Sequence, residues 1–114
     1  MATDYKQLMA DVSKQVGALR KDLPDTMGGF STMAAGADKA GALDSKTKEF
    51  VALGIAIALR CDPCIAFHTR SLIKLGCTKA EFEECLGTAV YMGGGPSLMY
   101  SSKALDCWDQ LSNS

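Results

Sequence analysis

The sequence predicts an all-α protein, a compact bundle of five or six helices, and three observations lead to this fold class. Apolar residues recur three and four positions apart through most of the chain, which is the period of an amphipathic helix. No stretch alternates apolar and polar residues as a half-buried strand does. Proline, glycine and capping residues separate the periodic segments. With 114 residues, one domain spanning 1–114 is expected.

The first helix is predicted over residues 5–19, where apolar side chains recur at helical spacing. It is expected to end between residues 20 and 23, before Pro24, because proline disfavours helical backbone in the residue that precedes it. A second helix is predicted from Asp25 to about Ala35. Two adjacent glycines weaken it, since glycine has low helix propensity.

A loop is expected over residues 36–41, and a third helix is expected to start at Asp44 or Ser45. This helix carries Glu49 in an early turn and then the apolar run 50–59. The run is too short to cross a bilayer, which needs about 20 residues. It is apolar on every face, so it must be covered on all sides. In a chain this short a neighbouring subunit is a natural cover, and an oligomer is expected.

The remaining helices are predicted from the residues at their ends. One should begin near Asp62 and end at Gly76, which suits a left-handed C-cap. Thr78 and Glu81 have the spacing of a capping box and should start the next helix. The segment 93–96 has three glycines before a proline, so it should end that helix and open the last one.

Cys61, Cys64 and His68 form the segment of the chain with the most evident chemistry. With Asp62 as N-cap and Pro63 in the first turn, Cys64 also lies in the first turn, where unpaired N–H groups and the helix dipole favour a thiolate. Cys61 is expected just outside the helix, near enough to close a disulfide. His68 follows Cys64 by four residues and shares its helix face, where the imidazole can take the thiol proton or hold the thiolate. The spacing therefore predicts a redox-active nucleophile.

Two other interpretations of the CxxC pair stay open. The pair could be half of a zinc site, with His68 as a third ligand and Cys77 or Cys85 as the fourth, although the chain has no second CxxC and no HxxxH pair. Alternatively, the two thiols are small buried groups and His68 is a core histidine with its hydrogen bonds satisfied. Outside the motif, Cys77, Cys85 and Cys107 are expected to act as small buried apolar groups.

The composition argues against several kinds of partner and compartment. A formal charge of −1 and a pI near 5.7 provide no basic surface for nucleic acid. Five cysteines are an odd number in a chain that is not cysteine-dense, so a secreted disulfide framework is not expected. Residues 1–6 contain no apolar targeting stretch. We therefore expect a cytoplasmic protein without a membrane or nucleic-acid partner.

Four sequence elements match one known family. They are Leu43-Asp44-x-Lys46-x-Lys48-Glu49, the small apolar helix that follows it, Cys61-x-x-Cys64-x-x-x-His68, and Gly76-Cys-Thr-x-x-Glu81. With these elements the chain resembles the AhpD-like alkylhydroperoxidases of the carboxymuconolactone decarboxylase superfamily. The signature of that family places a glutamate twelve residues before the first cysteine, as Glu49 stands before Cys61. The resemblance covers about residues 24–92.

The resemblance implies an all-helical subunit assembled into homotrimers or homohexamers, with its site in a pocket near a subunit boundary. The catalytic residues implied are Glu49, Cys61, Cys64 and His68. By that likeness Glu49 and His68 form a proton relay that activates a cysteine, which we assign to Cys64. On its own, Glu49 would be taken for a solvated charge in the first turn of a helix. The resemblance is what makes it a site residue.

The implied reaction is the reduction of a hydroperoxide by the two thiols. Cys64 attacks the terminal oxygen as a thiolate, which gives a sulfenic acid and an alcohol or water, and Cys61 then forms the disulfide. An external dithiol donor, thioredoxin-like or lipoyl, restores the pair by thiol–disulfide exchange. No metal, haem or other cofactor is required. The sequence leaves open which of the two cysteines is attacked first.

One position departs from the family pattern, and other functions stay open. Pro63 stands where the best-characterised members carry a second histidine, so one proton carrier is missing, and a disulfide reductase or a redox partner of another enzyme is an alternative. A decarboxylase acting on a small carboxylated lactone is a second alternative, but that chemistry has no use for paired thiols. A third is a non-enzymatic helical oligomer whose disulfide senses oxidation or docks a partner.

Overall fold

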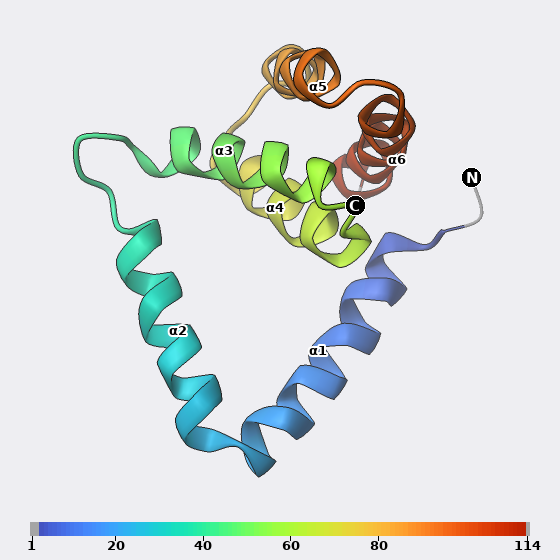
Figure 1. Cartoon of the computed structure of the whole chain (residues 1–114). Helices are drawn as coiled ribbons and strands as arrows, with labels where there is room; N and C mark the ends of the chain where they lie inside the picture. The colour runs from blue at the N-terminus through green and yellow to red at the C-terminus, as the bar shows by residue number, and fades with distance from the viewer. Residues whose placement is uncertain (1–2, 114) are drawn as a thin grey trace.

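The computed structural model describes residues 3–113, which form six helices and no strand (Figure 1). In chain order the helices are α1 (Tyr5–Asp22), α2 (Pro24–Asp38), α3 (Ser45–Ala58), α4 (Asp62–Lys74), α5 (Lys79–Gly93) and α6 (Gly95–Ser112). The predicted all-α class is confirmed. The predicted domain 1–114 also includes residues 1, 2 and 114, which lie outside the described residues, and its extent stays a prediction.

Most helix ends follow the local signals in the sequence. α1 ends at Asp22, before Pro24. Gly76 follows α4 with φ of 80°, a left-handed conformation that glycine adopts without a steric penalty. At the start of α5, Thr78 and Glu81 make both hydrogen bonds of a capping box. These local contacts set the lengths of the helices that position the site.

The second helix is longer than its sequence predicts. It continues to Asp38, three residues into the segment 36–41 that was expected to be a loop. Lys48 accounts for the difference, because its ammonium donates hydrogen bonds to the carbonyls of Ala37 and Lys39 at 2.8 and 2.6 Å. A cation from a later helix thus satisfies carbonyls that the end of α2 leaves without helical partners.

The main core lies among α3, α4, α5 and α6. Its fully buried members from the first three of these helices are Leu53, Ile57, Ile65, Leu72 and Phe82. Trp108 of α6 closes the core against Phe82, with ring centroids 4.8 Å apart. Burying each such side chain contributes about 1.5–3 kcal/mol to stability. The core therefore holds α3 and α4, which carry the site, firmly side by side.

The first two helices project from this four-helix body as the arms of a V (Figure 1). α1 is attached by Tyr5 and Met9, which lie one helical turn apart and are buried together with residues of α4 and α6. α2 contributes no buried residue, and Phe30 and Met33 are 60% and 63% exposed. An apolar surface is thus left open on α2 in the single chain.

We expect Tyr5 to make stability depend on pH in the alkaline range. Burial, and then the charge of Asp62, raises the pKa of Tyr5 from 10.0 to about 12. Between these two values the folded chain keeps a proton that the unfolded chain releases. The contribution of neutral Tyr5 to the free energy of unfolding is therefore complete below pH 10 and is lost as the pH rises toward 12. A shift of this size corresponds to about 2–3 kcal/mol.

The measurement is urea unfolding of the wild type and of Tyr5→Phe at pH 9 and pH 12. The variant should lose less stability than the wild type between the two values, by up to about 2–3 kcal/mol. An equal loss in both proteins would show that Tyr5 ionises as freely in the folded chain as in the unfolded one.

Candidate active site

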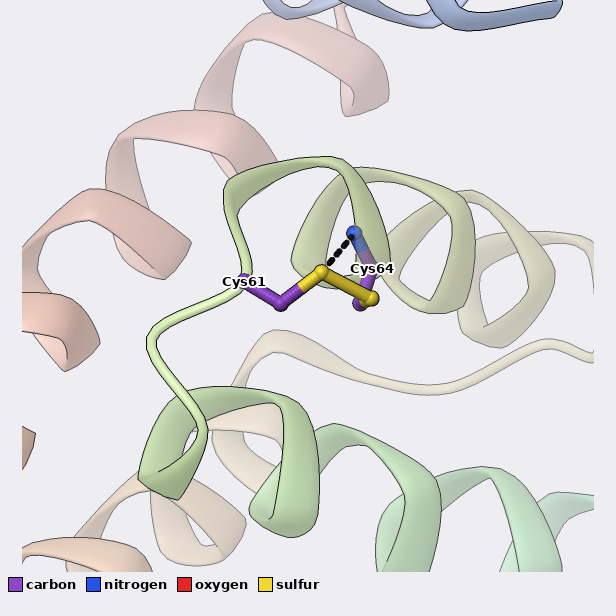
Figure 2. The surroundings of a disulfide bond; sticks show 2 residues. All are labelled: Cys61 and Cys64. Carbon is purple, nitrogen blue, oxygen red and sulfur yellow. Dashed lines mark hydrogen bonds between the residues drawn. A yellow bond between two sulfur atoms is a disulfide. The ribbon is translucent and has the colours of Figure 1, made fainter. Parts of the chain in front are cut away.

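Cys61 and Cys64 form a disulfide at the N-terminus of α4, with their Cα atoms 5.2 Å apart (Figure 2). The expected N-cap, Asp62, is wrong by one residue. Cys61 is the N-cap, and its Sγ accepts a hydrogen bond from the backbone N–H of Cys64 at 3.3 Å. The disulfide holds this sulfur over the helix end, in the place that a capping oxygen would take, so Asp62 becomes the first helical residue.

This correction changes which sulfur benefits from the helix terminus. Cys64 lies in the first turn of α4 as predicted, but its own N–H points at the sulfur of Cys61 (Figure 2). Negative charge on Cys61 is therefore favoured by the helix end. His68 is four residues further along the same helix, and its expected stabilisation of charge on Cys64 stays a prediction. The helix end thus acts on the sulfur of Cys61.

The turn from α3 into α4 contains a residue in an unfavourable conformation. Arg60 has φ of 57°, and its N–H and that of Cys61 donate to the carbonyls of Ile57 and Ala56, both at 3.1 Å. The same pair of hydrogen bonds ends α4, where Gly76 takes the left-handed position. An arginine in that position costs roughly 1–2 kcal/mol more than a glycine. The chain tolerates this cost immediately before the disulfide.

Glu49 and His68 meet between α3 and α4. The carboxylate Oε2 of Glu49 lies 2.6 Å from Nδ1 of His68, and Glu49 is only 5% exposed. An ionised carboxylate only accepts hydrogen bonds, so we assign the ring proton to Nδ1, which then donates a hydrogen bond to Oε2 of Glu49. Nε2 is then the ring nitrogen able to accept a proton. The structure brings together the two residues that the family resemblance implied, while their catalytic role stays a prediction.

The Glu49 side of this pair faces a small cleft. The cleft has a volume of about 270 Å³. Its lining residues come from the end of α2, the start of α3 and the end of α4: Asp38, Ser45, Glu49, Ser71, Lys74 and Leu75. Glu49 thus lines this cleft with only a small part of its surface, while the disulfide lies at the other end of α4.

The three cysteines outside the motif carry free thiols. Cys77 and Cys107 are buried as predicted, whereas Cys85 is only half-buried. Burial raises the pKa of all three thiols, that of Cys107 to about 12. Cys77 and Cys85 donate to the carbonyls of Thr78 and Phe50. Within residues 3–113, no three His, Cys, Asp or Glu side chains are placed to hold a metal ion.

Two of the elements that match the family are joined by an ion pair. Lys46 of α3 contacts Glu81 of α5 at 2.9 Å, and hydrogen bonding to Glu81 raises the pKa of Lys46. The backbone N–H of Thr78 and then Lys46 lower the pKa of Glu81. Lys48, in the same element, holds the end of α2. These motif residues therefore position α3, and Glu49 is the one that reaches the site.

An ion pair beside the disulfide had no signal in the sequence. Lys103 of α6 lies 3.1 Å from the carboxylate of Asp62 and is also 4.8 Å from the centre of the Tyr100 ring. Forty-one positions separate the two charged residues, so no helical spacing could indicate their contact. The first turn of α4 is thus tied to α6 by charge.

A larger cavity, of about 620 Å³, lies between α3 and α5 and contains none of the four predicted site residues. Its walls are mostly apolar and include Phe50, Val51, Ile55, Cys85, Ala89 and Met92. Val51 and Ile55 are each 54% exposed, so the apolar face of α3 opposite the core is open in the single chain. No helix within residues 3–113 is long and apolar enough to cross a membrane.

The fold and the site together define an all-helical protein with a CxxC disulfide at the start of a helix that also carries a Glu-bound histidine. The carboxymuconolactone decarboxylase family matches residues 24–106, and the chain belongs to this family. An uncharacterised protein of Cupriavidus necator is 36% identical over 97% of this chain and 98% of its own length. An uncharacterised protein of Haemophilus influenzae is 34% identical over 95% and 96% of the two chains.

Solved structures agree with the assignment. A carboxymuconolactone decarboxylase family protein from Legionella pneumophila superposes with a TM-score of 0.93 at 47% identity, and the match covers 95% of this chain and 96% of that one. A family member from Thermotoga maritima superposes with a TM-score of 0.83 at 24% identity, covering 92% and 90%. This second likeness shows the fold.

We expect the thiol count to identify the disulfide. The oxidised chain should show three reactive thiols after denaturation, and the reduced chain should show all five, because only the CxxC pair is joined. Titration with a thiol reagent in denaturant checks this, and peptide mapping identifies the linked cysteines. Five thiols after treatment with one equivalent of an organic hydroperoxide would contradict the expectation.

Proposed function

We propose that the protein is a thiol-dependent peroxidase and disulfide oxidoreductase whose CxxC pair is activated by a Glu–His relay. The observation that carries the proposal is the 2.6 Å contact between the buried Glu49 carboxylate and His68, on the helix that begins with the cysteine pair. A histidine held in one tautomer, four residues after a cysteine, is suited to act as its base.

In the proposed reaction, His68 takes the thiol proton of Cys64 at Nε2, and the thiolate attacks the terminal oxygen of the hydroperoxide. The O–O bond breaks, and the leaving alkoxide or hydroxide takes the proton back from His68. Cys64 is then a sulfenic acid. His68 then takes the thiol proton of Cys61, whose thiolate attacks the sulfur of Cys64. The S–O bond breaks, the leaving hydroxide takes that proton from His68 to become water, and the disulfide forms. A dithiol donor reduces the disulfide and is itself oxidised.

Glu49 keeps the histidine ring in place and favours the imidazolium that forms when the thiol loses its proton. The carboxylate is already desolvated and hydrogen-bonded, so it needs little rearrangement during the reaction. Pro63 supplies no proton carrier, so His68 is assigned both proton transfers. The proposed electron donors are a thioredoxin-like protein or a lipoyl group in the cytoplasm.

The likeness to other proteins supports a redox role. An involvement in antioxidative response has been suggested for the Thermotoga maritima family member. The name of the family refers instead to a decarboxylase reaction. The disulfide between Cys61 and Cys64 favours the redox proposal, because that decarboxylation makes no use of paired sulfurs.

Three variants should separate the roles of the site residues. Cys64→Ser should abolish continuous peroxide consumption with dithiothreitol as reductant. His68→Gln should lower the rate by about 10²–10⁴-fold, the usual contribution of a general base. Glu49→Gln should lower it less, because an amide still holds the ring but does not favour the imidazolium. The measurement is peroxide consumption, with circular dichroism to establish that each variant is folded.

Cys85→Ser is the matched control, since this thiol is half-buried in α5 and lies outside the motif. It should leave the rate unchanged. Unchanged rates for Cys64→Ser, His68→Gln and Glu49→Gln would overturn the relay. If Cys61→Ser failed to reduce even one equivalent of peroxide while Cys64→Ser still reduced one, the roles of the two sulfurs would be exchanged. Oxidation of the wild type without turnover would indicate a sensor.

We also propose that a second copy of the chain covers the open apolar face of α3, within a homotrimer or homohexamer. The run 50–59 is apolar on every face, but the single chain covers only the side that includes Leu53 and Ile57. The opposite side lines the 620 Å³ cavity, and the apolar surface of α2 is also open. Surfaces of this kind mark protein–protein contacts.

Ile55→Asp should therefore dissociate the oligomer, because it places a charge on the face to be covered. Sedimentation velocity should show several chains per particle for the wild type and one for the variant, with the helical content of both unchanged. A monomeric wild type, or an oligomer that the substitution does not affect, would contradict the proposed interface.

A further inference from the structure

Asp62 places a negative charge inside the CxxC segment, between the two sulfurs in sequence. It follows Cys61 directly and precedes Cys64 by two residues, within the first turn of α4. A carboxylate within the same helical turn opposes the ionisation of a neighbouring thiol, because two negative charges repel. The helix dipole favours Asp62 and the thiolate alike, so the dipole does not remove the repulsion between them.

Lys103 is placed to remove this repulsion. Its ammonium lies 3.1 and 3.4 Å from the two carboxylate oxygens of Asp62, and both side chains are about two-thirds buried. The centre of the Tyr100 ring lies 4.8 Å from the ammonium and also stabilises the cation. Partial burial weakens screening by water and salt, so the charge of Lys103 acts on the motif more strongly than an exposed lysine would.

The other charged groups around the motif do not neutralise Asp62. His68 contacts Glu49 instead, and Arg60 is exposed to solvent. Asp106, one turn after Lys103 on α6, accepts a hydrogen bond from Gln110. Tyr5 stays neutral, and its raised pKa reflects the charge of Asp62 as well as burial. Lys103 is thus the cation in contact with this carboxylate.

We infer that Lys103 is a positioning residue for the CxxC pair: by neutralising Asp62 it permits a cysteine of the pair to ionise near neutral pH. This inference rests on the proposed thiol chemistry of the same site. It adds a residue from α6, outside the family motif, that sets how much of the attacking thiolate is present. The charge of Lys103 offsets the field of Asp62 at the cysteine pair, and Lys103 touches neither substrate nor sulfur in this role.

The test is the thiolate pKa of the reduced protein, followed by ultraviolet absorbance at 240 nm in wild type, Lys103→Met, Asp62→Asn and the double variant. Methionine keeps most of the alkyl chain over Tyr100 and removes the charge. Lys103→Met should raise the thiolate pKa by about one unit, and Asp62→Asn should lower it. The double variant should lie near the wild type. Burial raises the pKa of Cys77, Cys85 and Cys107, which keeps their ionisation out of the titration at low pH.

Lys79→Met is the matched control, because Lys79 pairs with Asp109 at the surface and not with the motif. It should leave the thiolate pKa unchanged. If the Lys103–Asp62 pair only anchored α4 to α6, both single variants would have a lower melting temperature. The thiolate pKa would then be unchanged in both variants, or would move in the same direction in both. Either result would overturn the inference. The thiolate titration needs no peroxide, so a failed peroxidase assay and a failed electrostatic role are told apart.

Discussion

The buried carboxylate of Glu49 is the constraint on which the site depends. It lies in a helix whose other inward residues are apolar, and an unpaired charge there would cost several kcal/mol. His68 satisfies it across the boundary between α3 and α4. The contact therefore fixes how the two helices lie along each other. Cys64 is one turn before His68, so the disulfide lies on the helix that this contact joins to α3.

The turn that leads into the disulfide shows a second constraint. The ends of α3 and α4 make the same pair of hydrogen bonds, and they differ in the residue that takes the left-handed position. Gly76 takes it after α4, but Arg60 takes it before Cys61. Residues held in costly conformations persist where the surrounding structure determines them, and such positions cluster at functional sites. Here the packed side of α3 and the covalent link at Cys61 hold the turn from both ends.

Local chemistry made most of the fold predictable. Pro24, Gly76 and the capping box of Thr78 and Glu81 act on their own neighbours, so their effects could be inferred from the sequence. The end of α2 could not, because it depends on a lysine ten residues further along the chain. An aspartate is a better N-cap than a cysteine by propensity. The covalent bond between two sulfurs overrode that preference.

The site was predictable where spacing along one helix carries the information. Cys64 and His68 share a face of α4, and this follows from a separation of four residues. Glu49 lies in a different helix, and its local pattern fits a solvated charge equally well. Its burial is decided by the packing of α4 against α3, so it was identified only through the family resemblance. Neither helical spacing nor the family resemblance indicated the contact of Lys103 with Asp62, because this contact depends on how α6 packs against the start of α4.

The two faces of α3 differ in burial. Glu49, Leu53 and Ile57 face the core, where packing holds the carboxylate rigid. Val51 and Ile55 face the larger cavity and are open. Residues on the open face do not contact Glu49 or His68 in the hydrogen bond that joins them, so this face can vary without loss of the Glu49–His68 contact. Rigid packing on one side and a free apolar face on the other explain why α3 is apolar all around and yet carries one buried acid.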